Sequence, residues 1–305
     1  MRAMFTTSAV LNALSLLLIM STGVVRCSSL PAPGTPGTPV MPSTGLPAST
    51  SRSPLGALYE DSQALLRNAL PMTDSIQDPS TLPTIPFLEV CRDFVSVQRV
   101  LGGPAMAKSA DELEQNIRLC EEFIRCEEEG TCETLGDIFE LEKQRGIHGR
   151  GGILCDPSMA CSILWIRRSI AIQITGISIL LKSSQNDGGA PKRAAMDAYR
   201  QELMPYHYRG LRVVWTLGIQ ATCNKPRKQY LEGFKSGTEA ETLSLMRSIA
   251  DLWQPLINGL MVMQAAYDFE DDRKWGLRGA STGDHGGHGG VEEGKGEVGG
   301  EVEEA

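Results

Sequence analysis

Two polar residues in the middle of the chain have the types and spacing of a binding pair. Glu112 and Asn116 are four residues apart in a stretch with helical periodicity, so their side chains share one face of a helix. The third position on that face is Leu119, within about 60° of the other two around the helix axis. The carboxylate can accept hydrogen bonds from two hydroxyl groups, and the carboxamide can both donate and accept. The pair suits a ligand with several hydroxyl groups, although a solvated helix face would look the same.

A second candidate lies in the stretch SILWIRRSIAIQITGISILL, residues 162–181. Trp165 offers a flat apolar face to the C–H face of a ring, and Arg167 and Arg168 could meet an anion. The apolar run that follows, residues 170–181, is too short to cross about 30 Å of hydrocarbon. We therefore expect a buried core helix. The plain alternative to a binding role is a core tryptophan at position 165 and a solvated helix start for the two arginines.

Catalytic motifs do not emerge from the sequence. The chain has neither a G-x-S-x-G elbow nor an H-E-x-x-H pair, and His148 sits in a Gly-rich loop without an evident nucleophile. His285 and His288 could bind a metal, but two histidines in a Gly-rich tail form a weak signal. We expect no enzyme, no cofactor and no metal site.

Helical periodicity predicts an all-α domain. It extends over residues 60–70, 109–126, 133–145, 196–221 and 240–269, with Gly-rich or Pro-containing breaks between them. In residues 109–126, Ser109 and Glu112 have the spacing of a helix N-cap with a capping box. The same stretch has an apolar stripe that should face the core, made of Leu113, Ile117, Cys120 and Ile124.

Composition divides the 305 residues into four parts. Residues 1–27 have a basic start and a short apolar core, which predicts a signal peptide or signal anchor. Residues 28–56 hold seven Pro, six Ser, four Thr and four Gly, and we expect a disordered linker. Residues 57–275 form the folded domain, and the Gly/Glu-rich residues 276–305 a disordered acidic tail. The net charge of −8 argues against a nucleic-acid binder.

Four segments, in order, resemble the glycolipid transfer protein (GLTP) family. Residues 87–117 contain the family's FLE start, its L-G-x-P turn and its later Asn-Ile motif. Residues 134–143 resemble its TL-x-x-I-x-x-x-EK helix, residues 164–168 its L-W-L-x-R motif, and residues 198–207 its AY-x-x-x-L-x-x-YH segment. The resemblance covers about residues 80–270. It implies a two-layer helical sandwich around an apolar tunnel for lipid chains, and non-enzymatic transfer of sphingolipids between membranes.

The resemblance also implies a headgroup site. An ungapped match assigns Glu112, Asn116, Trp165 and His207 to the family's acidic, Asn, Trp and His positions. The family's Lys position falls on Leu119, which is a departure. A one-residue shift, which would restore a cation, places Asp111, Gln115 and Arg118 at the same spacing, so Asp111 and Arg118 stay nearby candidates.

Trp165 and Asn116 favour a sugar headgroup, because the branch of the family that carries ceramide 1-phosphate has Arg and Lys there. Arg168, one turn beyond Trp165, could still reach an anion. The alternatives are therefore transfer of ceramide 1-phosphate and a lipid-binding sensor or scaffold that does not shuttle. His207 should hold the ceramide amide carbonyl, and the apolar residues after Arg168 and His207 should line the tunnel.

The resemblance further implies transient contact with a membrane surface. Where family members have a Trp two residues after the His, this chain has Arg209, with Tyr208 beside it. Protein partners are unknown. The N-terminal segment suggests the secretory pathway or an organelle reached through it, whereas the family usually works in the cytoplasm. In an oxidising compartment the cysteine pairs 126/132 and 155/161 could close short loops, and free thiols are the alternative.

Overall fold

The computed structural model describes residues 53–69, 79–148 and 154–270. These residues form helices and no strand, apart from one isolated bridge between Pro83 and Thr134. The prediction of an all-α domain is therefore confirmed. The expected leader, almost all of the expected linker and the expected tail, with His285 and His288, lie outside the described residues. The elements are α2 (Pro54–Ala69), η1 (Pro79–Thr81), α3 (Thr84–Leu101), α4 (Pro104–Cys126), α5 (Leu135–Gln144), α6 (Met159–Lys182), α7 (Ala190–Glu202), η2 (Met204–Tyr206), α8 (Arg209–Thr222), α9 (Arg227–Glu232) and α10 (Glu239–Ala266).

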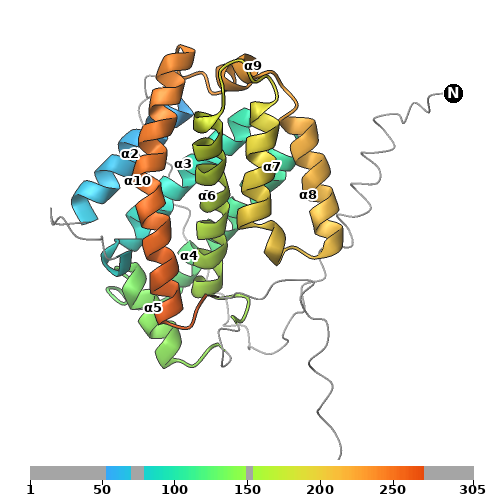
Figure 1. Ribbon diagram of the computed structural model, residues 1–305. Coiled ribbons are helices and arrows are strands. Elements are labelled where there is room, and N and C mark those ends of the chain that lie inside the picture. Colours follow the sequence, from blue (N-terminus) through green and yellow to red (C-terminus); the bar gives the residue numbers. More distant parts are fainter. Residues whose placement is uncertain (1–52, 70–78, 149–153, 271–305) are drawn as a thin grey trace, which may run out of the picture.

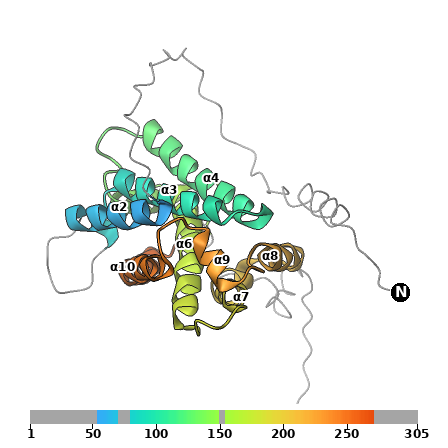
Figure 2. The same ribbon diagram turned by 90° about the horizontal axis from the view of Figure 1, so that it is seen from above.

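The helices stack in two layers, as the resemblance implied. Figure 2 shows α2, α3 and α4 in one layer and α10, α6, α7 and α8 in the other. In Figure 1, α6 runs through the centre of the second layer, between α10 and α7. Contacts between α2 and α10, between α4 and α6, and between α4 and α8 join the layers. The site described below lies where α4 meets α6 and α8.

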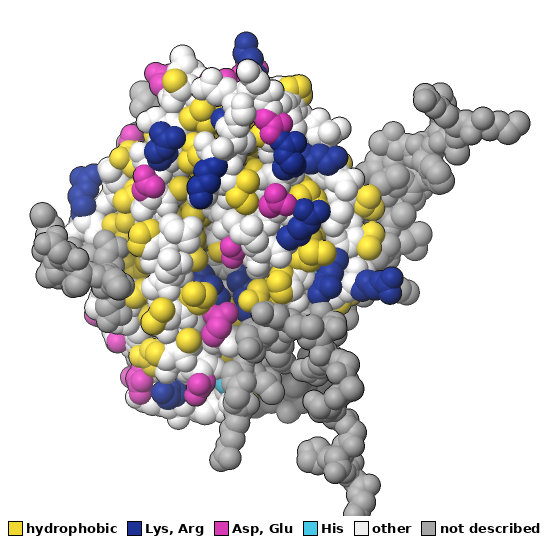
Figure 3. Space-filling model, viewed as in Figure 1, with side chains coloured by type: hydrophobic (Ala, Val, Ile, Leu, Met, Phe, Trp, Pro, Cys, Tyr) yellow, Lys and Arg dark blue, Asp and Glu magenta, His cyan; other side chains and the backbone are white. Residues whose placement is uncertain are grey.

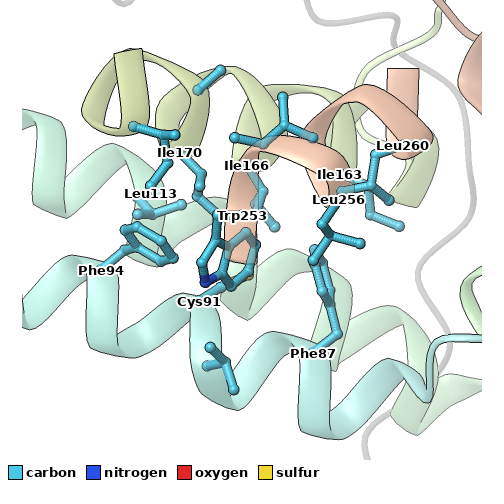
Figure 4. Packing of buried hydrophobic residues seen from close by; sticks show 14 of the residues in the cluster. Phe87, Cys91, Phe94, Leu113, Ile163, Ile166, Ile170, Trp253, Leu256 and Leu260 are labelled. Carbon is cyan, nitrogen blue, oxygen red and sulfur yellow. The ribbon is translucent and has the colours of Figure 1, made fainter. Parts of the chain in front are cut away.

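Two aromatic side chains of one layer enclose a tryptophan of the other. Trp253 of α10 lies 4.8 Å from Phe94 and 6.4 Å from Phe87 of α3, measured between ring centroids. Its indole N–H donates to the hydroxyl of Ser62 on α2, at 2.8 Å. Figure 4 shows how Trp253 packs among residues of α3, α4 and α6. Burial of such large rings supplies much of the hydrophobic stabilisation of the sandwich.

Glycine makes the turn between α3 and α4. Gly102 has φ of 69° and Gly103 has φ of 85°, a region that L-residues rarely adopt. A Cβ atom on Gly103 would also come within 2.7 Å of the Thr222 hydroxyl, at the end of α8. The turn thus brings the start of α4 against α8.

Two local predictions were wrong. Ser109 is not an N-cap, because α4 begins five residues earlier, at Pro104. Ser109 therefore lies within the helix, and it is buried. Residues 196–221 are not one helical run: α7 and α8 are separated by η2 and by His207, whose ψ of 135° is extended. Pro205, inside this break, lacks the N–H that a continuous helix requires. The break places His207 between two helices.

The apolar stripe of α4 is confirmed, because Leu113, Ile117 and Cys120 are fully buried and Ile124 packs against the core. The expected linker ends a little early, since α2 begins at Pro54.

A buried glutamate fixes the start of α6. The carboxylate of Glu142 accepts from the backbone N–H groups of Met159 and Ala160, at 2.7 and 3.0 Å. It also lies 2.8 Å from Nε2 of His148, whose Nδ1 accepts from the backbone N–H of Cys155. An anion at a helix N-terminus is stabilised by the unpaired N–H groups there. His148 thus has a structural role at the start of α6.

By length and composition, α6 is the one helix among the described residues that could cross a membrane. Here it packs against α4, α7 and α10 and buries twelve of its residues, among them Arg167 and Arg168. It is the central helix of the sandwich, as expected. The alternative in which the two arginines form a solvated helix start is wrong.

Candidate functional site

An apolar cavity lies between the two layers. It occupies about 720 Å³, open solvent at its mouth included. Its wall combines residues of α3 and α4 with residues of α6, α7, α8 and α10, and most of them are apolar; they include Val97, Leu101, Ile172, Gly176, Ile177, Ile219 and Met246. Residues of the apolar run of α6 and of α8 therefore line a cavity, as the sequence predicted, while others, such as Ile170 and Ile174, fill the core.

Gln98 is a polar wall residue that the sequence analysis did not anticipate. Gln98 of α3 is buried, and its Oε1 accepts no hydrogen bond from the described residues. A buried carbonyl oxygen is costly without a donor. Within the cavity, Gln98 can accept a hydrogen bond from a hydroxyl group of a ligand.

Trp165 and His207 stack on each other. Their ring centroids are 6.4 Å apart and their planes are inclined by 24°. Trp165 packs in the same cluster as Ile172, Trp215 and Ile219, which line the cavity. Because Trp165 and Ile172 are seven residues apart, they share one face of α6. The stacked pair thus adjoins the cavity.

His207 is held in place by two neighbours. Its Nδ1 lies 3.1 Å from the hydroxyl of Tyr199, and its backbone carbonyl accepts from Nε of Arg212 at 2.7 Å. Burial, together with the charges of Arg212 and Arg168, lowers the pKa of His207 to about 4. The imidazole is therefore neutral at pH 7.

Glu112 and Asn116 are both half-buried, one turn apart on α4. The Asn116 carboxamide donates to the backbone carbonyl of Glu112 at 2.9 Å. Ser109, on the same side of α4, lines the cavity, so this polar pair continues the cavity-lining face of the helix. The helix α4 packs against α6, which carries Trp165, and against α8, which begins just after His207.

A lysine that the sequence analysis missed stands beside this pair. Nζ of Lys108 lies 3.5 Å from the carboxylate of Glu112. Partial burial raises the pKa of Glu112, and the Lys108 ammonium opposes that shift. The i, i+4 spacing of Lys108 and Glu112 is the sequence signal that indicates this pair. Leu119 itself is half-buried.

The residues of the shifted register point to solvent. Asp111, Gln115 and Arg118 are exposed. Asp111 pairs with Arg99 at 3.4 Å, and Arg118 pairs with Glu114 at 2.7 Å. Both side chains are engaged on the outer surface of the helix pair α3 and α4.

Arg168 is close to Trp165 but does not face solvent. Its guanidinium lies 5.4 Å from the centroid of the Trp165 ring and 3.5 Å from that of Tyr206. Nη2 of Arg168 is 3.1 Å from the carboxylate of Glu270, which also binds Arg167 at 2.6 Å. The sequence did not reveal this carboxylate, because it lies about 100 residues away.

The expected membrane contacts lie at the start of α8. Tyr208 and Arg209 are exposed, and Val213 and Leu217 follow Arg209 at four-residue intervals on the same face, with 54% and 46% of their surface exposed. In Figure 3, hydrophobic and basic side chains occupy the edge of the molecule that α8 forms.

All seven cysteines in the described part of the chain are free, including both pairs considered for disulfides. Within the same residues, no group of three or more His, Cys, Asp or Glu side chains could hold a metal ion.

Comparison with known proteins identifies the domain. Residues 82–232 match the model of the glycolipid transfer protein (GLTP) family. This chain carries a GLTP domain. The match begins before α3 and ends at α9, so α2 and α10 of the sandwich lie outside it. None of the curated proteins matches the chain.

Solved structures have the same fold. Human ceramide-1-phosphate transfer protein in complex with 12:0 ceramide-1-phosphate superposes with a TM-score of 0.60 at 15% identity, over 71% of this chain and 97% of that one. Arabidopsis ACD11 gives 0.56 at 17% identity, over 71% and 100%. The GLTP-fold domain with which FAPP2 selects simple glycosphingolipids gives 0.53 at 18% identity, over 74% and 98%. At these identities the likeness establishes the GLTP fold, and proteins of both headgroup classes share it.

Proposed function

We propose that this GLTP-domain protein moves sphingolipids between membranes without chemical change, and that its cargo is a glycosphingolipid. The observation that carries the proposal is the stacked pair Trp165 and His207, which adjoins the apolar cavity. A lipid bound there would place its polar head at the rings and its chains in the cavity. Both parts of an amphipathic ligand then meet matching surfaces.

Five side chains would hold the headgroup and the ceramide amide next to it. The indole of Trp165 provides the flat apolar partner for a sugar ring. Glu112 and Asn116 provide acceptors and a donor for hydroxyl groups. Lys108, beside Glu112, adds the ammonium donor that the Leu119 side chain lacks. His207, neutral at pH 7, donates from Nε2 to the amide carbonyl of ceramide when Nδ1 accepts from Tyr199.

The hydrocarbon chains of the lipid would fill the cavity and displace solvent from it. Burial of a methylene group stabilises by about 0.8 kcal/mol, in a protein cavity as in a bilayer. Lipid extraction is then nearly balanced in free energy, which is what a reversible carrier requires. No covalent step is needed.

The exposed face of α8 would rest on the membrane. Tyr208 is adjacent to His207 in the chain, so this face borders the headgroup residues. Val213 and Leu217 would enter the interface, and Arg209 would meet anionic lipid. Contact there lets a lipid pass from the bilayer to the site over a short path.

A transfer assay tests the proposal. Donor vesicles carry fluorescent glucosylceramide, ceramide 1-phosphate or phosphatidylcholine, and the loss of each to acceptor vesicles is followed with catalytic amounts of protein. Transfer of glucosylceramide above the other two supports the proposal. Transfer of ceramide 1-phosphate alone would show that ceramide 1-phosphate is the cargo. Binding of a lipid without its transfer to acceptor vesicles would show that the protein is a sensor or scaffold.

A further inference from the structure

One carboxylate holds two arginines beside the candidate headgroup site. Glu270 Oε2 is 2.6 Å from Nη2 of Arg167, and its Oε1 is 3.1 Å from Nη2 of Arg168. Both guanidinium groups are almost fully buried. Arg167 also donates from Nε to Gln264 at 2.6 Å. Two cations share one anion, so the cluster carries a formal charge of +1.

The segment that delivers Glu270 is firmly packed. Phe269 is buried, 5.5 Å from Phe139 and 4.6 Å from His148 between ring centroids. Its backbone N–H donates to the carbonyl of Gln264 at 2.7 Å, which closes the turn after α10. These contacts tie the turn to α5 and to the start of α6. Glu270 is thereby fixed over the arginines.

The cluster adjoins the ligand-binding rings. The guanidinium of Arg168 is 3.5 Å from the centroid of Tyr206 and 5.4 Å from that of Trp165. Tyr206 precedes His207, and Trp165 stacks on His207. A charge on Arg168 that was no longer matched by Glu270 would therefore act directly on the headgroup site.

We propose that Glu270 determines which headgroup charge the site accepts, by occupying the arginines that would otherwise bind a phosphate. This inference rests on the proposed headgroup site. Guanidinium groups bind phosphate with charge-assisted hydrogen bonds, as they here bind the carboxylate. With Glu270 in place, a phosphate would lie beside a fixed negative charge, and Nη2 of each arginine is already bound to the carboxylate. The site is then left to a neutral sugar.

Glu270→Gln tests the inference, because it removes the charge and keeps the shape. Binding of fluorescent ceramide 1-phosphate and of fluorescent glucosylceramide in phosphatidylcholine vesicles is measured by energy transfer from tryptophan, for the full chain. We expect ceramide 1-phosphate to bind about tenfold tighter than to the wild type, as one added charge-assisted contact would give. Glucosylceramide binding should change less than about threefold.

The matched control is Glu239→Gln. Glu239 pairs with another buried arginine, Arg227, at 3.4 Å, at the opposite end of α10. The Glu239→Gln variant should bind ceramide 1-phosphate and glucosylceramide with wild-type affinity. A folded Glu270→Gln protein with wild-type affinity for ceramide 1-phosphate overturns the inference, and so does an equal gain in the control.

A second variant keeps the inference testable if Glu270→Gln does not fold, because that change leaves two buried cations without a carboxylate. Glu270→Asp keeps the charge and withdraws it by one methylene group. It should gain ceramide 1-phosphate affinity by about threefold, and a folded Glu270→Asp protein without any gain overturns the inference equally. Absence of glucosylceramide binding in the wild type would instead refute the proposed cargo, while the ratio of the ceramide 1-phosphate affinities still decides the role of Glu270.

Discussion

The hydroxyl of Tyr199 lies 3.1 Å from Nδ1 of His207, in a cluster of rings that also contains Trp165 and Trp215. Burial in this cluster is the main reason why the pKa of His207 falls to about 4. A neutral imidazole held through Nδ1 presents Nε2 to a ligand. Burial therefore sets the charge of the histidine, and the contact with Tyr199 sets its orientation.

Transfer should be insensitive to pH between 8 and about 5.5, because His207 stays neutral throughout that range. Its folded-state pKa is below the ordinary value of about 6.5, so protonation favours the unfolded state. The stability contribution is complete above pH 6.5 and is lost as the pH falls towards 4. Over that interval the loss is on the order of 3 kcal/mol.

The measurement is thermal unfolding from pH 8 to pH 4 for the wild type and for His207→Gln. Only the difference between the two proteins is informative, because Asp93 acts in the opposite direction. Burial and the nearby Asp61 raise the pKa of Asp93 to about 7, so its protonation stabilises the fold as the pH falls. Parallel curves for the two proteins would contradict the assignment to His207.

Trp165→Ala should abolish glucosylceramide transfer in a protein that still folds. Stacking on a sugar contributes on the order of 1 kcal/mol, and the lost apolar area adds to it. Trp165→Phe should keep part of the activity, since a smaller flat face remains. Circular dichroism accompanies each assay, and a folded Trp165→Ala protein with normal transfer would disprove the sugar platform.

Lys108→Met should lower glucosylceramide transfer by about three- to tenfold, because the ammonium beside Glu112 is lost. The control is Lys228→Met, an exposed lysine on α9. Leu119→Lys should raise transfer and restore activity to the Lys108→Met protein. Failure of both changes to affect transfer would remove the cation from the headgroup site.

Two substitutions of Gly176, a residue of the cavity wall, can be compared: one small and one large side chain. A Cβ atom there would meet the Cβ of Ala198 at 3.6 Å, an ordinary contact, so Gly176→Ala should stabilise α6 by about 1 kcal/mol and keep transfer. Gly176→Phe should fill the cavity and displace lipid chains. Extraction of the purified proteins followed by mass spectrometry should find less bound lipid, or shorter chains, in the Phe variant only. Equal lipid content in both would show that chains lie elsewhere.

The pair of changes Val213→Ser and Leu217→Ser should weaken sedimentation with vesicles and slow transfer by about tenfold, because both residues are exposed on α8. Met261→Ser with Val262→Ser is the matched control, since these are exposed apolar residues on α10, at the other side of the layer. Arg209→Gln should reduce binding only to vesicles that contain anionic lipid. Equal losses in the two pairs would indicate general surface hydrophobicity.

Local sequence determined the helices and most of the buried stripe. The spacing of Leu113, Ile117 and Cys120 predicts the inner face of α4, because residues three and four apart share one side of a helix. The glycines at 102 and 103 mark the turn for a similarly local reason, since only glycine adopts their φ angles readily. The order of four short motifs was enough to indicate the GLTP family.

Tertiary structure alone decided which apolar residues line a cavity and which fill the core. Ile172 and Ile174 look equivalent in the sequence, yet one faces the cavity and the other is fully buried. It also decided that Arg167 and Arg168 are buried and paired with a carboxylate. Their partner Glu270 follows about 100 residues later, and only packing of α10 against α6 brings the carboxylate to them. Helical periodicity repeats within a few residues, whereas this ion pair depends on how two helices far apart in the chain, α6 and α10, pack side by side.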